Sequence, residues 1–396
     1  MAQVSAFATP YASERSLNTP PHIRFTGRDN GFRKALTARV DTYLASAGKG
    51  RGADTALALK TMFYGTATVA LYAMMLFDGA VWWKTGLLAI LYGVCALLFA
   101  INIGHDAAHI AVTGSRRLDS AIQRLVFIPI GIDGYLWQMR HLGSHHVFPN
   151  VNGCDIDIDE NPFLRLSPNH APKRWQRRQH LYAVPVYMLT LLHSIFWGDF
   201  VYLRKRSLAN MHDIRHHPLD IASFVAAKLA YLAITLLVPM LVLPFAWWQV
   251  LIGYVAMTAA MSLLFIFLLV GTHFSDAASF PKPQADGTLP TTWAEHAVAS
   301  SVDWAPESRI AIFISGGANA HAAHHLFPRL SHTHARAVTR IVRETAREFG
   351  VAYHETGFRE MLRGHFRHLK ALGQRDPDRE RDGDHGDGGV HLAEAA

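Results

Sequence analysis

The sequence contains little cysteine and few charged side chains. Its 396 residues include only two cysteines, Cys95 and Cys154, which excludes a disulfide framework and an iron–sulfur centre held by cysteines. Charged residues make up 17% of the chain, whereas soluble proteins average about 25%. Hydrophobic residues make up 50%. This composition predicts an integral membrane protein.

Several common motifs are also missing from the sequence. The first thirty residues lack the apolar core of a signal peptide, so we expect the first membrane span to serve as the insertion signal. There is neither a His-Pro-Gly-Gly haem-binding motif nor a glycine fingerprint for a flavin or nicotinamide, so we expect no fused redox domain. The formal net charge is +7. We attribute it to loops facing anionic lipid headgroups and predict no nucleic-acid partner.

Long apolar runs are abundant instead. Four of them are long enough to cross a bilayer, which takes about 20 residues, at 61–78, 82–103, 223–246 and 249–270. Tryptophan pairs flank these runs where an interfacial aromatic belt belongs, at Trp82, Trp83, Trp247 and Trp248. Two further runs, 122–139 and 181–202, are interrupted by proline, glycine or polar residues. We interpret both as interfacial or re-entrant helices.

The distribution of basic residues predicts the topology and the domain organisation. Lys and Arg are concentrated in the N-terminal segment and the central loop, so the positive-inside rule places both termini and that loop in the cytoplasm. We expect a cytoplasmic segment at 1–55, a membrane domain at 56–372 and a disordered tail at 373–396. The expected fold is an all-α integral membrane protein with four transmembrane helices and a cytoplasmic helical cap.

Histidine is the residue type that carries the chemistry. Eight of the 24 histidines fall into three clusters, which we call box one (105–109, HDAAH), box two (141–146, HLGSHH) and box three (321–325, HAAHH). Spacings of three and four residues place two rings on one face of a helix, where both reach one ion. Eight rings are too many for one zinc and suit two metal ions, and imidazole suits iron, zinc, copper or nickel. The predicted ligands are His105, His109, His141, His145, His146, His321, His324 and His325.

Four neighbouring features need separate interpretations. His273 is a ninth candidate ligand, because the end of the last apolar run must lie beside the ends of the others. Asp106 points about 100° away from His105 on a helix, so we expect it to orient a ring and not to bind metal. The histidines at 212–217 are interpreted as a solvated loop. The acidic segment 155–160 lacks the spacing of an EF-hand calcium loop.

The three boxes, arranged around four apolar runs, resemble the membrane-bound fatty acid desaturase superfamily. The resemblance extends over roughly residues 60–360. It includes the segments 150–168 and 324–351, which are similar to the stretches after the second and third boxes of linoleoyl-CoA-type and acyl-lipid desaturases.

The resemblance implies a fold, a cofactor and an activity. Members use a non-haem centre of two iron ions, O2 and two external electrons to remove two hydrogens from adjacent methylenes of an acyl chain. All nine histidines match family ligands, and no catalytic residue beyond them is expected. Electrons are expected from a separate ferredoxin or cytochrome b5-type carrier. A basic loop is a candidate site for that carrier, a phosphopantetheine headgroup or the lipid surface, with Lys173, Arg174, Arg177 and Arg178.

Two departures from the family and three alternatives remain. His321 stands where many front-end members have Gln, which argues against front-end regiochemistry, and Leu269 stands where animal acyl-CoA members have Asn. The boxes do not separate a desaturase from a superfamily hydroxylase, acetylenase or ketolase acting on an apolar substrate. A metal transporter would need a polar path that 82–103 and 249–270 do not offer. The alanine- and arginine-rich composition favours a bacterial inner membrane, with the active site cytoplasmic.

Overall fold

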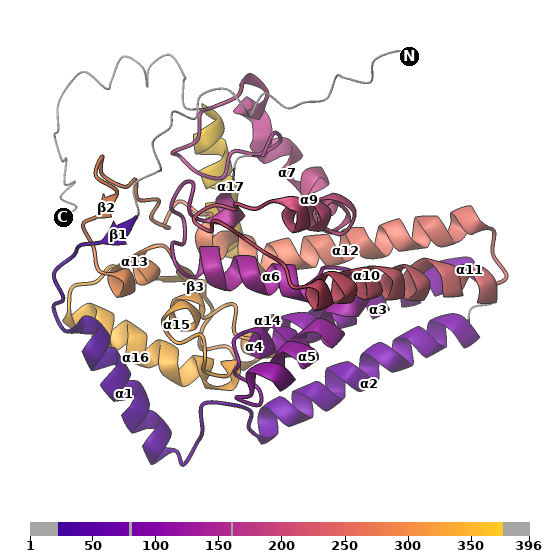
Figure 1. The fold of residues 1–396 in the computed structure, drawn as a ribbon, viewed down its shortest axis with the longest axis horizontal. Coiled ribbons are helices and arrows are strands. Elements are labelled where there is room, and N and C mark those ends of the chain that lie inside the picture. Colours follow the sequence, from indigo (N-terminus) through magenta and orange to yellow (C-terminus); the bar gives the residue numbers. More distant parts are fainter. Residues whose placement is uncertain (1–22, 79–80, 160, 375–396) are drawn as a thin grey trace.

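A computed structural model of the protein describes residues 23–78, 81–159 and 161–374. Long helices lie side by side at one end of the molecule, and shorter helices form a cap at the other end (Figure 1). The predicted tail at 373–396 falls outside the described residues beyond Gln374, as do the first 22 residues of the predicted N-terminal segment.

The long helices are α2 to α4 and α10 to α12. Helix α3 (Trp82–Phe99) continues through a π-helical turn, η1 (Ala100–Gly104), into α4 (His105–Ala108). Helix α10 (Pro218–Leu232) continues through a π-helical turn, η7 (Ala233–Leu237), into α11 (Val238–Val242). Together with α12 (Trp247–His273), these make three stretches long and apolar enough to cross a membrane, at Trp82–Ala108, Pro218–Val242 and Trp247–His273. The structure is therefore that of a multi-pass membrane protein.

Helix α2 (Thr55–Phe77) corresponds to the predicted span at 61–78 but is not among those three stretches. It is 23 residues long and is capped at its N-terminus by Asp54, whose carboxylate accepts a hydrogen bond from Leu57 N. Polar residues such as Lys60 interrupt its apolar sequence. It nevertheless runs alongside α3 (Figure 1) and turns exposed apolar side chains outward, including Val69 (70% exposed) and Phe77 (86%). This apolar outer face suits contact with lipid.

The two interrupted runs, predicted to be interfacial or re-entrant, are each divided into several short helices. The first comprises α5 (Arg116–Phe127), a 3-10 turn η2 (Ile128–Ile130) and α6 (Gly134–Arg140). The second comprises α7 (Gln179–Met188), α8 (Thr190–His193), the π-helical turn η6 (Ser194–Gly198) and α9 (Asp199–Arg204). Its two halves, Arg174–Met188 and Thr190–Arg204, meet at 62° and are either one broken span or a re-entrant loop.

The cap consists of helices from both ends of the described chain. They are α1 (Phe32–Ser46), α13 (Trp293–Ala299), α14 (Arg309–Ser315), α15 (His321–Leu326), α16 (Ala335–Glu348) and α17 (Phe358–Gln374). Short 3-10 turns lie between them and in the central loop, at η4 (Ile156–Ile158), η5 (Arg174–Arg178) and η8 (His332–His334). Apolar residues of α1 recur every four positions, so one stripe of the helix faces inward. That stripe, Phe32, Leu36, Val40 and Leu44, packs on α13, α15 and α16.

The described structure is mostly helical, as predicted, and adds two small sheets that were not predicted. Strand β1 (Arg24–Phe25) pairs in parallel with β2 (Thr288–Leu289), and β3 (Val302–Trp304) pairs in parallel with β4 (His354–Thr356). Pairs of two or three residues carry too short an alternation to be recognised in a sequence. Each one joins segments that are far apart in the chain and so ties the cap together.

Candidate metal centre

The ends of four helical segments bring all nine predicted histidines together. Box one follows the π-turn η1 at the end of α3, and box two follows α6. His273 is the last residue of α12, and box three forms α15. The site therefore lies where the long helices meet the cap (Figure 1).

One set of rings surrounds His141, and we call it the outer group. Nε2 of His141 lies 3.3 Å from Nε2 of His105, 3.1 Å from that of His109 and 3.0 Å from that of His146. Nε2 of His324 lies 3.0 Å from that of His146. Three of these side chains, His105, His141 and His324, are only partly buried.

The remaining four rings form what we call the inner group. Ligand nitrogens of His145, His273, His321 and His325 all lie within 4.8 Å of one another, and all four residues are buried. Nε2 of His273 lies 2.7 Å from Nε2 of His321 and 3.0 Å from Nε2 of His325. The ring centroids of His146 and His325 are 4.4 Å apart, so the two groups are neighbours.

Hydrogen bonding alone does not explain this convergence. A neutral imidazole nitrogen carries either one proton or one lone pair, yet Nε2 of His141 faces three other Nε2 atoms at hydrogen-bond distance. Buried Nδ1 atoms of His146 and His325 have no hydrogen-bond partner among the described residues. Nitrogen atoms that converge in this way fit two bound cations, and the described site offers no cysteine ligand.

Burial keeps most of these rings in the state that binds metal. It lowers the pKa of His146, His324 and His325 well below its usual value, and neighbouring histidines lower it further. Burial also lowers the pKa of His321 to about 3. These imidazoles are therefore neutral near pH 7, and a neutral ring has a lone pair for a cation.

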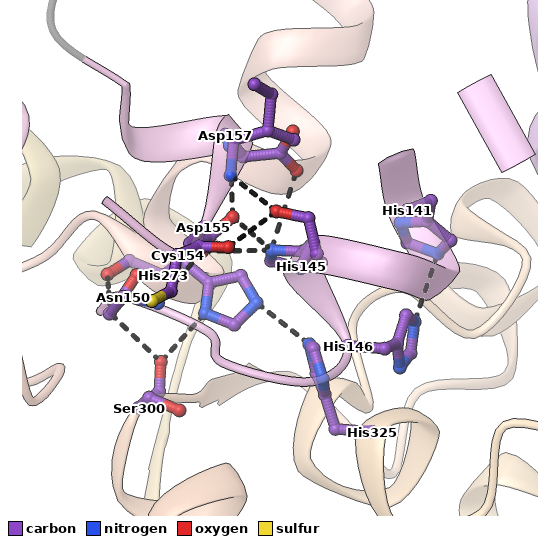
Figure 2. Close-up of polar contacts among 12 residues, drawn as sticks. His141, His145, His146, Asn150, Cys154, Asp155, Asp157, His273, Ser300 and His325 are labelled. Atoms are coloured by element: carbon purple, nitrogen blue, oxygen red, sulfur yellow. Dashed lines mark hydrogen bonds and ion pairs between the residues drawn. The ribbon is translucent and has the colours of Figure 1, made fainter. Parts of the chain in front are cut away.

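His145 differs from the others because carboxylates face its second nitrogen. Nδ1 of His145 lies 3.1 Å from Asp155 and 3.5 Å from Asp157 (Figure 2). Burial lowers the pKa of His145, but the two carboxylates outweigh burial and raise that pKa to about 9. Asp155 also accepts a hydrogen bond from the backbone N–H of Asn150. This carboxylate therefore fixes the ring so that Nε2 points into the inner group.

Backbone carbonyls orient two other rings of the inner group. His273 donates from Nδ1 to the carbonyl of Ser300 at 2.8 Å, and His321 donates from Nδ1 to the carbonyl of Ala318 at 3.1 Å. The side-chain amide of Asn150 donates to the carbonyls of His273 and Ser300 (Figure 2). These contacts fix the tautomer that leaves Nε2 of each ring for a ligand.

The geometry of box two departs from the expected α-helix. Residues His141–His145 form a π-helical turn, η3, in which His146 N donates to the carbonyl of His141, five residues back. This wider turn brings His141 and His146 to the same side. π-turns inside helices occur frequently at functional sites, and a second one, η1, ends directly before His105.

Asp106 orients a ring, but not one of the nine. Its carboxylate accepts hydrogen bonds from Ser331 Oγ at 3.0 Å, His332 N at 3.1 Å and His332 Nδ1 at 2.9 Å. Nε2 of His332 in turn lies 2.7 Å from Nζ of Lys60 on α2. Neither His332 nor Lys60 was predicted to belong to the site, because nothing in their spacing identifies them.

Other predicted features lie outside both groups. His212 and His217 are exposed, as expected for a solvated loop, whereas His216 is half-buried and lies 3.0 Å from the hydroxyl of Tyr135. In the acidic segment, the carboxylates of Asp155 and Asp157 face Nδ1 of His145. The basic residues Arg174, Arg177 and Arg178 are exposed on η5, away from the histidines.

This multi-pass helical membrane protein gathers nine histidines, of which box one and His273 lie at the ends of two spans, and such a site fits the class of membrane-bound metalloenzymes. Comparison with known proteins gives the family. The fatty acid desaturase family model matches residues 80–357, so the chain belongs to the fatty acid desaturase family. It is an oxidoreductase that desaturates fatty acyl chains.

Curated relatives match most of the chain. A sn-1 linoleoyl-lipid 6-desaturase from Synechocystis is 27% identical over 90% of this chain and 99% of its own length. A second sn-1 linoleoyl-lipid 6-desaturase, from Arthrospira platensis, is 30% identical over 84% of this chain and 90% of its own length. An acyl-lipid (8-3)-desaturase from Physcomitrium patens is 29% identical over 86% and 72%.

Proposed function

We propose that the two histidine groups bind one iron ion each and that the enzyme introduces a double bond into an acyl chain esterified to a membrane lipid. The observation that carries this proposal is the convergence of nine rings into two adjacent groups. The outer group would hold one ion with His105, His109, His141, His146 and His324. The inner group would hold the other with His145, His273, His321 and His325.

The reaction class selects iron from the metals that imidazole binds. Removing hydrogen from an unactivated methylene is an oxidation, and zinc has no redox chemistry. When bound, two iron ions would supply the activation of O2. One O2, two electrons, two protons and the two substrate hydrogens balance as one new double bond and two waters.

The residues of this chain orient the ligand rings and exclude water from part of the site. Asp155, Ser300 and Ala318 hold the rings of the inner group through their outer nitrogens. The indole of Trp137 stacks on His141 with ring centroids 4.3 Å apart. Trp137 also packs beside Phe127 within the apolar core of the bundle. That side of the outer group is therefore apolar and suits an approaching acyl chain.

Other observations support our proposals for the acyl carrier and for the cellular location. The named relatives from Synechocystis and Arthrospira platensis act on linoleoyl lipids, which supports a lipid-linked substrate here. The sites at the ends of Trp82–Ala108 and Trp247–His273 lie at one end of the bundle, and the basic loops support a cytoplasmic position for it. We place the protein in a bacterial inner membrane, supplied by a separate electron carrier.

Expression in a bacterium with a defined lipid profile tests the proposal. Fatty acids released from each lipid class are compared by mass spectrometry between wild type and His145→Ala, and metal content is measured by elemental analysis. Two iron ions per chain and a lipid-linked product two mass units lighter are expected. A product sixteen mass units heavier would instead indicate hydroxylation, and zinc without any altered lipid would overturn the proposal.

A further inference from the structure

We propose that electrons reach the metal centre through Trp293 and that the basic surface around Arg33 docks a small acidic one-electron carrier. This inference rests on the proposed iron centre, because only a redox metal needs such a supply. It concerns a residue outside the nine histidines and a surface outside the membrane bundle.

Trp293 connects the surface of the cap to box two. It is the first residue of α13, and its indole N–H donates to the backbone carbonyl of His146 at 3.4 Å. Its ring packs on the cluster that contains Ala322 and Ala323 of box three. The guanidinium of Arg33 lies over the ring, 4.9 Å from its centroid. One half-buried indole therefore bonds to box two, packs on the cluster that includes part of box three, and is partly exposed.

The path from Trp293 to the outer group is short and is made mostly of covalent and hydrogen bonds, as electron transfer requires. Tunnelling rates fall steeply with distance, and covalent or hydrogen-bonded bridges carry electrons better than gaps. From the His146 carbonyl the path runs within one residue to its imidazole. Nε2 of that imidazole lies 3.0 Å from those of His141 and His324 in the outer group.

Other tryptophans near the centre do not offer this path. Trp137 stacks on His141 but packs into the apolar core of the bundle, where a water-soluble carrier has no access. Trp304 is buried, with its indole N–H bonded to the carbonyl of Leu268. Helix α13, by contrast, lies at the end of the molecule opposite the bundle (Figure 1).

The exposed surface around Trp293 has a small excess of basic side chains. Arg28, Arg33 and Lys34 are exposed, and none of them forms an ion pair within 4 Å among the described residues. Arg24 is also exposed and interacts electrostatically with Asp286. Asp29 and Glu295 accept hydrogen bonds only from neutral donors and keep their negative charge, so the four basic side chains outnumber the three carboxylates. A partner with clustered carboxylates is complementary to this surface.

The basic turn η5 is a different kind of surface. Its exposed Arg174 and Arg177 stand beside Trp175 (60% exposed), Phe163 (58%) and Leu181 (70%). Basic residues mixed with exposed aromatic and apolar side chains suit a lipid surface. We therefore assign η5 to the membrane and the surface around Arg33 to the carrier.

The electron balance sets the number of docking events. Each reduced carrier gives up one electron and leaves oxidised, so two carriers are consumed for every O2 and every double bond. Trp293 lies on the path and undergoes no net oxidation or reduction. The carrier must therefore bind transiently, which fits a site held by screened surface charges.

A binding experiment tests the docking surface without depending on turnover. The purified full-length protein is titrated with an oxidised plant-type [2Fe–2S] ferredoxin, and Kd is measured at several salt concentrations. The double variant Arg33→Glu/Lys34→Glu is expected to weaken binding about tenfold and to flatten its salt dependence. The matched control is Arg174→Glu/Arg177→Glu, which should keep the wild-type Kd. Weaker binding of the control, with the first variant unaffected, would overturn the proposed surface.

A kinetic experiment tests the path. Trp293→Phe keeps an aromatic ring but loses the bond to the His146 carbonyl, so reduction of the iron by ferredoxin should slow several-fold at an unchanged Kd. Reduction by dithionite, a small chemical donor, serves as the reference in both proteins. Equal rates of iron reduction by ferredoxin in wild type and variant would contradict the proposed role of Trp293. Failure of dithionite to reduce the iron in either protein would count against the iron centre itself.

Discussion

Nζ of Lys60 lies 2.7 Å from Nε2 of His332, and this contact ties helix α2 to the metal centre. The opposite nitrogen of the same ring donates to Asp106, the residue after His105. Lys60 thus has a structural reason to interrupt an otherwise apolar helix. It joins the first long helix to box one through a single imidazole.

Replacing Lys60 should loosen this junction. Lys60→Met removes the donor to His332 and leaves a buried ring nitrogen without a partner, which costs about 1–3 kcal/mol. The expected result is a lower thermal midpoint of the detergent-solubilised protein with iron binding partly retained. Lys84→Met is a suitable control, because Lys84 forms an ion pair with half-exposed Asp78 at a helix end. Equal midpoints for the two variants would contradict this role for Lys60.

Asp155 should control metal affinity without touching the metal. Asp155→Asn removes the carboxylate that holds Nδ1 of His145, and loss of such a partner typically lowers affinity about 10- to 100-fold. Chelator competition followed by elemental analysis measures this. Asp157→Asn is the comparison, because that carboxylate is partly exposed and more distant. Its effect on affinity should be clearly smaller.

The proposed ligands and the histidines of the central loop should behave oppositely. His145→Ala or His324→Ala should abolish activity and lower iron content, because each removes a ring from one group. His216→Ala should retain both, because within the described chain that ring contacts Tyr135 and none of the nine clustered histidines. Loss of iron in the His216 variant would mean that the metal site extends into the loop.

Gly316 should tolerate no side chain. Its φ is +60°, and a Cβ atom there would lie 2.6 Å from the carbonyl oxygen of Ile101 in the π-turn η1. Gly316→Ala should therefore destabilise the protein by about 1–3 kcal/mol and disturb His105. Thermal unfolding and iron content measure the two effects. Gly114→Ala is the matched control, since Gly114 also has a positive φ but nothing within 4 Å of the added atom.

Asp303 should make stability depend on pH. It accepts a hydrogen bond from Ala322 N at the start of box three, and burial raises its pKa from 3.8 to about 6. The folded protein therefore binds this proton more tightly than the unfolded chain, and the stability it contributes is lost as pH rises from about 4 through 6. Asp303→Asn should lack this loss. Unfolding of both proteins at steps between pH 4 and 7 measures the difference, and parallel curves would contradict it.

The sequence predicted which residues come together at the site, but it did not predict how they are arranged. Histidine spacing and the apolar runs predicted nine rings, and the structure brings these nine together, while their binding of metal stays a prediction. The partition into two groups was not predictable, because it depends on the π-turn at His141–His145. Backbone hydrogen bonding of this kind leaves no periodic pattern in the residues.

The contacts that orient the rings were also hidden, for a related reason. Ser300 acts through its backbone carbonyl on His273, and Trp293 acts through its indole on the carbonyl of His146. Every residue has a backbone carbonyl, so the sequence does not indicate which one accepts such a bond. The two pairs are also 27 and 147 positions apart in the chain. Only the folded chain brings them together.

The unequal burial of the two histidine groups has a consequence for how the protein gains and loses its metal. Three rings of the outer group are only partly buried, whereas all four rings of the inner group are buried, so a small chelator should reach the outer group first. Metal should therefore leave in two kinetic phases, the first fast and the second limited by local opening of the cap. A half-loaded protein would accumulate between them, and the order of reloading would be the reverse.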